Sequence, residues 1–276
     1  MTEMQRAYAV AGAAVRQRLL EQDPRRFEAL ASLGKNDVAV FQGTYDEAQR
    51  VLGVLDVPYR MNPRSLRGGL RRKRFKIAFV NCASSATDAR VAAVRRFVED
   101  GGWLVSSDWA LGHVVAKAFP QTIGWDRQRS TRDEVVSVEP ARDSLWREIV
   151  VPGVLPQWWL EGGSHAIAVH DARVRIEAAS HDMLARYDAP VVAASFLWGE
   201  GRVFHAISHF WLKRTRNQHE RHGEPGERFL HEALGLSPDG VAKALGCAGG
   251  EVSYGALQSA VTASELVAQL CIAAVC

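Results

Sequence analysis

The stretch VRRFVEDGGWLVSSDW, residues 94–109, decides the fold class of this chain. It completes an amphipathic segment, 88–100, whose apolar residues recur at helical spacing, so we predict a helix there. The glycine pair at 101–102 ends this helix, because glycine readily adopts the backbone conformations found at helix ends. The apolar run 103–105 then predicts a buried strand, which finishes in the polar residues 106–108. Helix, glycine turn and buried strand in this order are typical of α/β proteins.

The same alternation continues before this stretch. Apolar runs at 37–41 and 77–80 predict two further buried strands. Thr44 and Glu47 have the spacing of a capping box, which predicts a helix over 45–53. Strands that alternate with amphipathic helices predict a mostly parallel sheet covered on both faces, and we expect a flavodoxin-like, doubly wound α/β fold.

The pattern loosens after about residue 121. Three apolar segments there predict antiparallel strands, at 158–160, 166–169 and 173–178. Two further runs, 190–197 and 202–207, flank a Gly-rich turn, which is the pattern of a β-hairpin.

Both ends of the chain predict helices outside this alternating pattern. We therefore expect an N-terminal helical extension at 1–34, an α/β domain at 35–236 and a C-terminal helical appendage at 237–276. The N-terminus lacks the pattern of a signal peptide, and we expect no stretch that reaches the ~20 apolar residues of a membrane span. These features predict a cytoplasmic protein that does not associate with a membrane.

Composition excludes several classes of protein. The hydrophobic fraction of 47% and the charged fraction of 24% are typical of a globular protein. A net charge of +3 is too balanced to predict nucleic-acid binding, which needs clustered charge. The four cysteines are scattered and form no CxxC pair, which favours reduced thiols over a disulfide framework or a zinc knuckle. They are Cys82, Cys247, Cys271 and Cys276.

Four stretches of the chain resemble the class I glutamine amidotransferase-like superfamily, particularly its noncatalytic and trehalose-utilisation-like branches. They are VAVFQG at 38–43, KIAFVNCAS at 76–84, VRRFVEDGGWLVSSDW at 94–109 and GEGRVFHAISHF at 199–210. Together they span roughly residues 37–211. The resemblance implies a nucleophile elbow after the strand at 103–105 and a functional histidine from the closing strand. It also implies a role in a bacterial multi-gene system, and the high Arg and Ala content favours a GC-rich bacterial source.

The chain departs from this family at the two positions that carry catalysis. Catalytic members have a Gly-x-Cys-x-Gly elbow, where Asp108 stands here between Ser107 and Trp109. The family's closing His-Pro-Glu becomes His209-Phe210-Trp211, which lacks the glutamate. A glutamine-hydrolysing triad is therefore not expected, and neither is a cofactor.

Two of the candidate site residues have two interpretations each. Asp108 follows a parallel strand, where open α/β sheets bind ligands, and could bind a polar ligand or act as a general base. It could instead cap the following helix, since Asp is a good N-cap. Cys82 also follows a strand, and is either an inert buried thiol or a reactive one in an electropositive setting.

The histidines do not predict a metal site. His205 and His209 lie four residues apart on one strand, so they stand roughly 13 Å apart and cannot both ligate one ion unless the strand ends between them. His219 and His222 fall in a polar stretch, which we interpret as a solvated loop or helix start. His209, at the end of the closing strand, is the histidine we select as functional.

Two segments are candidates for contact with a partner. The basic run 64–76 is either a solvated loop or a clamp for phosphate or an acidic partner. The apolar tail, 239–276, docks either on its own chain or on another protein.

Two functions remain open from sequence. The first is a noncatalytic module, or pseudoenzyme, that acts through a protein partner or binds a ligand at the strand ends, through Gln42, Gly43, Asn81, Asp108 and Trp109. The second is a hydrolase of a small polar substrate that uses Asp108 and His209, with Cys82 or Ser107. Convergence of these side chains within ~4 Å favours the enzyme, because a base must reach the proton it moves. Their separation, or a crevice filled by Trp109, favours the module.

Overall fold

The computed structural model describes residues 1–66, 75–84, 86–146, 156–215 and 219–276, with the backbone alone at 126–128. Its helices are α1 (Glu3–Gln22), α2 (Pro24–Ala31), α3 (Ala48–Val54), α4 (Asp88–Glu99), α5 (Ala116–Ala118), α6 (His181–Tyr187), α7 (Gly226–Arg228), α8 (Pro238–Leu245) and α9 (Tyr254–Ala273). Its strands are β1 (Val38–Phe41), β2 (Arg60–Met61), β3 (Ile77–Val80), β4 (Trp103–Ser107), β5 (Ile123–Ser130), β6 (Glu134–Ser137), β7 (Glu139–Pro140), β8 (Gln157–Leu160), β9 (His165–Val169), β10 (Arg175–Ala179), β11 (Val191–Trp198) and β12 (Gly201–Ala206).

A central sheet of eight strands organises the chain in the order β2-β1-β3-β4-β12-β11-β10-β7. The strands from β2 to β12 are parallel, and β11, β10 and β7 extend the sheet in antiparallel pairings. Two small antiparallel pairs, β5–β9 and β6–β8, lie outside it. The protein is thus a mixed α/β structure with a mostly parallel central sheet.

The stretch at 94–109 folds as its sequence predicts. Helix α4 buries Val94, Phe97 and Val98 and ends at the glycine pair, after which β4 begins. Gly102 is required by packing, because a Cβ there would lie 2.3 Å from the ring of Phe97. The hairpin of β11 and β12 is also confirmed, with Trp198 opposite Gly201 at its turn.

The structure corrects the prediction for the loop after β1. Helix α3 begins at Ala48, and its N-cap, Glu47, makes no capping hydrogen bond with its side chain, so the capping box is wrong. The amide oxygen of Asn81 accepts from the backbone N–H of Ala48 instead. A residue 33 positions away therefore caps this helix, and no local pattern predicts that.

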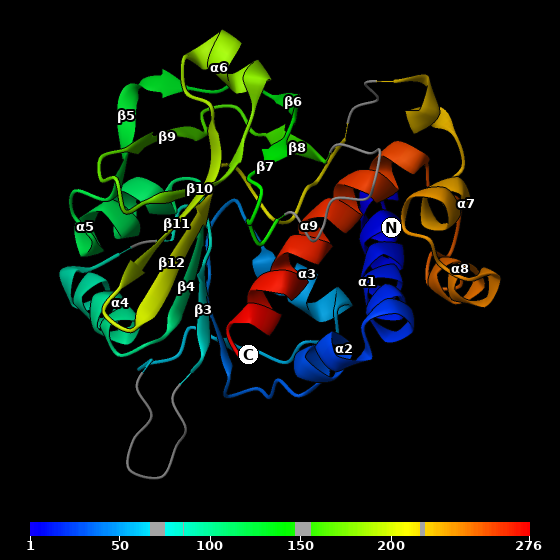
Figure 1. Cartoon of the computed structure of the whole chain (residues 1–276), viewed down its shortest axis with the longest axis horizontal. Coiled ribbons are helices and arrows are strands. Elements are labelled where there is room, and N and C mark those ends of the chain that lie inside the picture. The colour runs from blue at the N-terminus through cyan, green and yellow to red at the C-terminus, as the bar shows by residue number, and fades with distance from the viewer. Residues whose placement is uncertain (67–74, 85, 147–155, 216–218) are drawn as a thin grey trace.

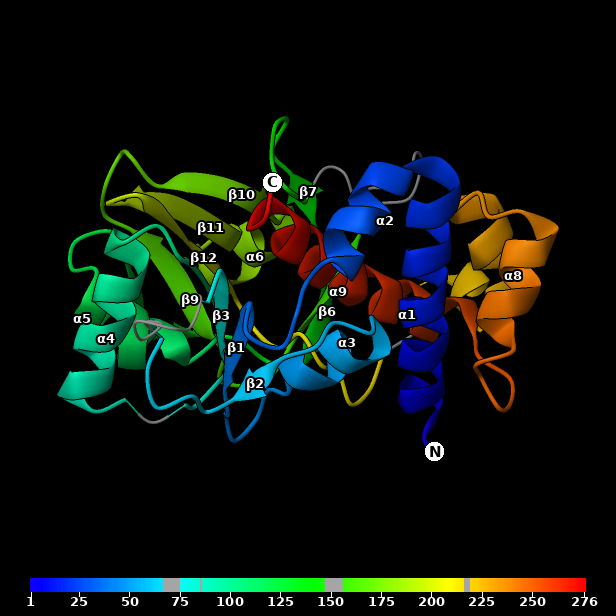
Figure 2. The same ribbon diagram turned by 90° about the horizontal axis from the view of Figure 1, so that it is seen from below.

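The helices at the two ends of the chain pack together as one layer. Figure 1 shows α9 lying against α1, and Figure 2 shows α1, α2, α3 and α9 on one side of the sheet with α4 and α5 on the other. Arg18 and Glu265 join α1 to α9 through two hydrogen bonds of 2.6 and 2.7 Å, with the carboxylate buried.

Helix α9 corrects the prediction that no stretch is apolar enough to span a membrane. Tyr254–Ala273 has a mean hydropathy of 1.3 over its most apolar window, of which 94% is buried inside the protein. Burial of this kind is typical of the core helix of a soluble protein. It also means that this part of the tail docks on its own chain.

Candidate functional site

Three of the predicted site residues come together at one edge of the central sheet. Cys82, Asp108 and His209 follow β3, β4 and β12, which are parallel neighbours. The carboxyl ends of parallel strands meet at one edge, so the three side chains converge there. One potential ligand atom from each lies within 4.8 Å of the other two.

Asp108 stands on a sharp turn between β4 and a π-helical turn, Leu111–Val115. Its φ is 45°, in the left-handed region that few residues other than glycine, asparagine and aspartate adopt readily. The carboxylate is 2% exposed, and accepts from the backbone N–H of His165 at 2.9 Å and from the hydroxyl of Ser164 at 3.0 Å. The side chain therefore does not cap the following helix, and that interpretation is wrong.

His209 lies between two carboxylates. Its Nε2 is 3.5 Å from Oδ2 of Asp108, and its Nδ1 is 4.0 Å from Oε1 of Glu161. Burial on its own lowers the pKa of His209, but the contact with Asp108 and the charges of Asp46, Asp108 and Glu161 outweigh it and raise the pKa. The surroundings therefore favour an imidazolium more than water does.

Cys82 is buried beside the same carboxylate, with its Sγ 3.7 Å from Oδ2 of Asp108. Burial, and then the negative charge of Asp108, raise the pKa of the Cys82 thiol. A thiol in this setting stays protonated, which favours the interpretation of Cys82 as a thiol that does not act as a nucleophile.

Ser107 belongs to a second polar centre, built around Asp46 at the same edge of the sheet. The Ser107 hydroxyl donates to Oδ2 of Asp46 at 2.6 Å and accepts from the backbone N–H of Cys82. Asp46 also accepts from the backbone N–H groups of Glu47, Phe210 and Trp211. The Ser107 hydroxyl is thus committed to the centre at Asp46.

The N-terminal helix fixes the turn that carries His209. The hydroxyl of Tyr8, on α1, donates to the carbonyl of Phe210 at 2.7 Å and accepts from the N–H of Leu212 at 2.9 Å. Its ring stacks on Trp211 with 4.1 Å between centroids. The N-terminal extension is therefore part of the support of the site.

The predicted ligand-binding residues after β1 and β3 are engaged with the protein or exposed. Gly43 lies so close to the next loop that a Cβ would meet the carbonyl oxygen of Cys82 at 2.2 Å. Asn81 caps α3 and also donates from its amide to Gln49. Gln42 is exposed.

Trp109 takes part in an aromatic stack beside Asp108. The ring of His165 lies between those of Trp109 and Trp125, with centroid distances of 5.4 and 3.6 Å. Burial lowers the pKa of His165 to about 4, so this imidazole is neutral at physiological pH. His165 thus joins the aromatic stack with its ring and binds Asp108 with its backbone N–H, and Trp109 is half-buried.

Sequence reasoning missed four residues of this region: Asp46, Glu161, Ser164 and His165. Asp46 lies between Thr44 and Glu47, which the sequence predicts to form a capping box, so it was not selected as a site residue. The other three belong to the segment without a clear pattern, and they contact residues 47 to 57 positions away in the chain, such as Ser208 and Asp108. No local sequence pattern predicts which distant residues this segment contacts.

The remaining candidates lie apart from this centre. His205 is fully buried on β12, with its Nδ1 2.9 Å from the hydroxyl of Ser106, and burial lowers its pKa to about 3. His219 is the N-cap of a short 3-10 helix, Glu220–Gly223, as the helix-start interpretation predicts, whereas a solvated loop is wrong for His222, which is buried with its ring stacked on Tyr254. Most of the basic run, 67–74, lies outside the described residues.

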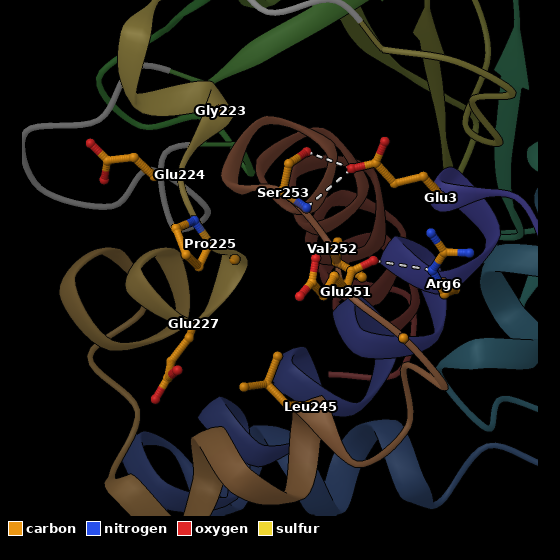
Figure 3. Close-up of a pocket in the computed structure, with 12 residues that line it drawn as sticks. Glu3, Arg6, Gly223, Glu224, Pro225, Glu227, Leu245, Glu251, Val252 and Ser253 are labelled. Carbon is orange, nitrogen blue, oxygen red and sulfur yellow. Dashed lines mark hydrogen bonds between the residues drawn. The ribbon is translucent and has the colours of Figure 1, made fainter.

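A separate cavity of about 600 Å³ opens among the terminal helices, as Figure 3 shows. Glu3 accepts from the N–H and hydroxyl of Ser253 there, and Arg6 donates to the carbonyl of Glu251. These contacts join the start of α1 to the start of α9. None of the sequence-predicted site residues lines this cavity.

No protein-family model matches the chain, and no curated protein matches its sequence. Solved structures with a similar fold include a ThuA-like protein from Bacteroides uniformis, at a TM-score of 0.46 and 9% identity, over 64% of this chain and 82% of that one. A glutamine amidotransferase from Thermotoga maritima matches at a TM-score of 0.41 and 8% identity, over 62% of this chain and 76% of that one.

A β-galactosidase from Rahnella sp. R3 matches at a TM-score of 0.46 and 11% identity, over 62% of this chain. The chain spans only 27–30% of the length of the β-galactosidases it matches. The structural neighbours thus include proteins of the kind that the sequence resembles, at low identity. At these TM-scores the neighbours assign no activity to this chain.

Proposed function

We propose that this chain is a noncatalytic amidotransferase-like module that binds a small polar ligand at the carboxyl ends of β3, β4 and β12. The observation that carries the proposal is the position of Asp108. In the family that the sequence resembles, the turn after this strand presents a thiolate. Here the same kind of turn presents a carboxylate that Ser164 and His165 hold in place.

The properties of the thiol support the same proposal. A cysteine nucleophile needs a depressed pKa, whereas burial and the charge of Asp108 raise that of Cys82. Asp108, His209 and Cys82 are each no more than 6% exposed. Three buried polar side chains facing one another are suited to holding a ligand. The order of the five parallel strands, second-first-third-fourth-fifth along the chain, supports the flavodoxin-like form of the fold, which binds ligands at this edge.

A role for protein partners stays part of the proposal, as the resemblance to multi-gene systems suggests. The burial of α9 argues against the C-terminal helix as the docking element, because residues from Tyr254 to Ile272 are already buried.

A hydrolase is the second candidate, favoured by the distance of 3.5 Å between Asp108 and His209. This distance meets the criterion of convergence within ~4 Å. The raised pKa of His209 would suit a general acid, with the carboxylate of Asp108 as the base. Burial bears equally on both candidates, because a ligand and a substrate each need access. What counts against the hydrolase is the lack of a side-chain nucleophile: the pKa of the Cys82 thiol is raised, and the Ser107 hydroxyl donates to Asp46.

One experiment separates the two candidates. The full-length wild type and Asp108→Asn would be screened against polar metabolites by thermal unfolding, with parallel assays of amide and ester hydrolysis. We expect a ligand that raises the Tm of the wild type by several degrees when saturating, and that has no such effect on Asp108→Asn.

Asp143→Asn is the matched control, because Asp143 is exposed. A ligand that stabilises Asp108→Asn as well as the wild type would move the site elsewhere, for example to the cavity at Glu3. Turnover that both Asp108→Asn and His209→Ala abolish would replace the module with the hydrolase.

A further inference from the structure

Besides the hydroxyl of Ser164, which donates to it at 3.0 Å, Oδ2 of Asp108 has two potential metal-ligand atoms close to it. Oδ2 of Asp108 lies 3.7 Å from Sγ of Cys82 and 3.5 Å from Nε2 of His209. The second distance exceeds the 2.7–3.2 Å range of good N–H···O hydrogen bonds. The imidazole nitrogen and the carboxylate therefore face each other without a normal hydrogen bond.

This spacing fits the edges of a tetrahedral metal site. Zinc binds sulfur at about 2.3 Å and nitrogen or oxygen at about 2.0–2.2 Å, so neighbouring ligand atoms stand roughly 3.3–3.7 Å apart. The two distances from Asp108 are within that range or at its limit. A ring nitrogen of His209 lies within 4.8 Å of Sγ of Cys82, so the third edge would shorten by up to about 1 Å on metal binding.

The Nε2 atom of His209 is available to a ligand. It is buried and has no hydrogen-bond partner among the described residues, although the side chain is only 8% exposed. Buried polar atoms normally have a partner, because an unpaired one costs the free energy of its lost hydration. A metal ion would supply that partner.

The surroundings also resemble the outer shell of a metal site. Metal-binding histidines usually place their second nitrogen near a carboxylate, which orients the ring. Glu161 is the carboxylate on that side of His209, at 4.0 Å from Nδ1, and would need to move closer to accept a hydrogen bond from it. Oδ1 of Asp108 accepts from the N–H of His165, whereas Oδ2 accepts from the hydroxyl of Ser164 and also faces Cys82 and His209.

We infer that Cys82, Asp108 and His209 form a binding site for one first-row transition-metal ion, with zinc as the ion that best suits a sulfur, oxygen and nitrogen donor set. The inference rests on the proposed ligand-binding role of this site and names the class of ligand. It departs from the sequence analysis, which expects no metal.

Protons balance in the binding step. The S–H bond of Cys82 breaks, a sulfur–metal bond forms, and the proton passes to solvent. A protonated His209 gives up a second proton, and Asp108 binds as the carboxylate. Three protein ligands leave one position of a tetrahedral ion for water or for a donor atom of a small molecule.

Cobalt(II) titration of the full-length protein tests the inference, because a cobalt–thiolate bond gives a charge-transfer band in the near ultraviolet. The reference protein is the Cys247→Ser/Cys276→Ser variant, stripped with a chelator, since those two thiols are exposed and would bind metal on their own. We expect one ion per chain with this band, and displacement of the cobalt by zinc.

Cys82→Ser in the same background should lose the band, whereas Cys271→Ser should keep it. Cys271 is the matched control, because it is also a buried, unpaired thiol. Glu161→Gln should weaken the affinity by about 10–100-fold, as loss of an outer-shell partner does. This variant also covers the case in which Cys82→Ser does not fold, because Glu161 is partly exposed.

Absence of bound ion in the reference protein would overturn the inference, and so would a band that Cys82→Ser leaves unchanged. If the protein binds a metabolite but no metal ion, the metal site is rejected and the proposed ligand-binding module is retained. If the protein binds a metal ion but no metabolite in the screen stabilises it, the metal site is supported and the binding of a small polar ligand is not.

Discussion

Two buried aspartates at the same edge of the sheet have opposite surroundings. Asp46, in the loop after β1, is fully buried and accepts from three backbone N–H groups and one hydroxyl. Asp108, in the turn after β4, accepts from only one backbone N–H and one hydroxyl, and its other contacts are a long hydrogen bond from the Cys82 thiol and the imidazole of His209 at 3.5 Å.

The difference separates a structural carboxylate from one available for binding. Asp46 joins three loops and has no capacity to spare, so it stabilises the edge of the sheet. One oxygen of Asp108 faces two titratable groups, Cys82 and His209, in addition to Ser164, and the backbone of Asp108 has a φ of 45°. Strained positions of this kind cluster at functional sites. Burial alone would not distinguish the two residues.

The largest expected effect is on the free energy of unfolding, when Asp46 and Asp108 are each replaced by asparagine. Asp46→Asn turns an amide NH₂ group towards donors that need an acceptor, so we expect a loss of about 3 kcal/mol or more in the free energy of unfolding. Asp108→Asn should cost about 1 kcal/mol or less, because asparagine tolerates positive φ and keeps an acceptor. Urea unfolding measures both. Equal losses would remove the distinction between the two aspartates.

Tyr8→Phe should weaken the support of the His209 turn by a smaller amount. It removes the hydroxyl that binds both Phe210 and Leu212 while keeping the ring on Trp211. Leaving the Leu212 N–H unpaired should cost about 1–3 kcal/mol in the same urea measurement. Tyr45→Phe is the control, because Tyr45 is 46% exposed and should leave the midpoint unchanged. An equal shift in both variants would contradict the role of Tyr8.

The pKa values of the histidines test whether the charge of Asp108 acts on His209. NMR of the imidazole protons between about pH 5 and 8 should show His209 with a pKa above its ordinary 6.5, and His205 neutral throughout because burial lowers its pKa to about 3. In Asp108→Asn the pKa of His209 should fall, since a charge that favours the imidazolium is gone. An unchanged pKa in that variant would show that Asp108 does not act on His209.

The contributions of His209 and His205 to the free energy of unfolding change with pH in opposite directions. A raised folded pKa means that His209 contributes stability below pH 6.5, which is lost as the pH rises through the folded value. His205 has a lowered pKa, so the unfolded chain binds its proton first and stability declines as the pH falls from 6.5 towards about 3.

Thiol reactivity gives the smallest expected change. In the native metal-free protein, a thiol reagent should modify Cys247 and Cys276, which are exposed, and leave the buried Cys82 and Cys271 intact. All four should react in denaturant. Rapid modification of Cys82 in the folded protein would mean that Asp108 does not suppress its thiolate, and would reopen the enzymatic interpretation.

Sequence by itself determined the frame of this site. The buried strands β3, β4 and β12 and the helix at 88–100 each have a local apolar period, and their order places the residues after them at one edge. Cys82, Asp108 and His209 could therefore be selected from sequence, because strand ends are encoded by neighbouring residues.

Tertiary structure alone decided what those residues face. Asp46 is tied to Phe210 and Trp211 across 164 and 165 positions, and Asp108 is bound by His165 from a segment without a clear pattern. Helix α9 is likewise buried by contact with α1 from the opposite end of the chain. Periodicity is a property of neighbours in sequence, whereas hydrogen-bond partners and burial depend on which distant segments the fold brings together.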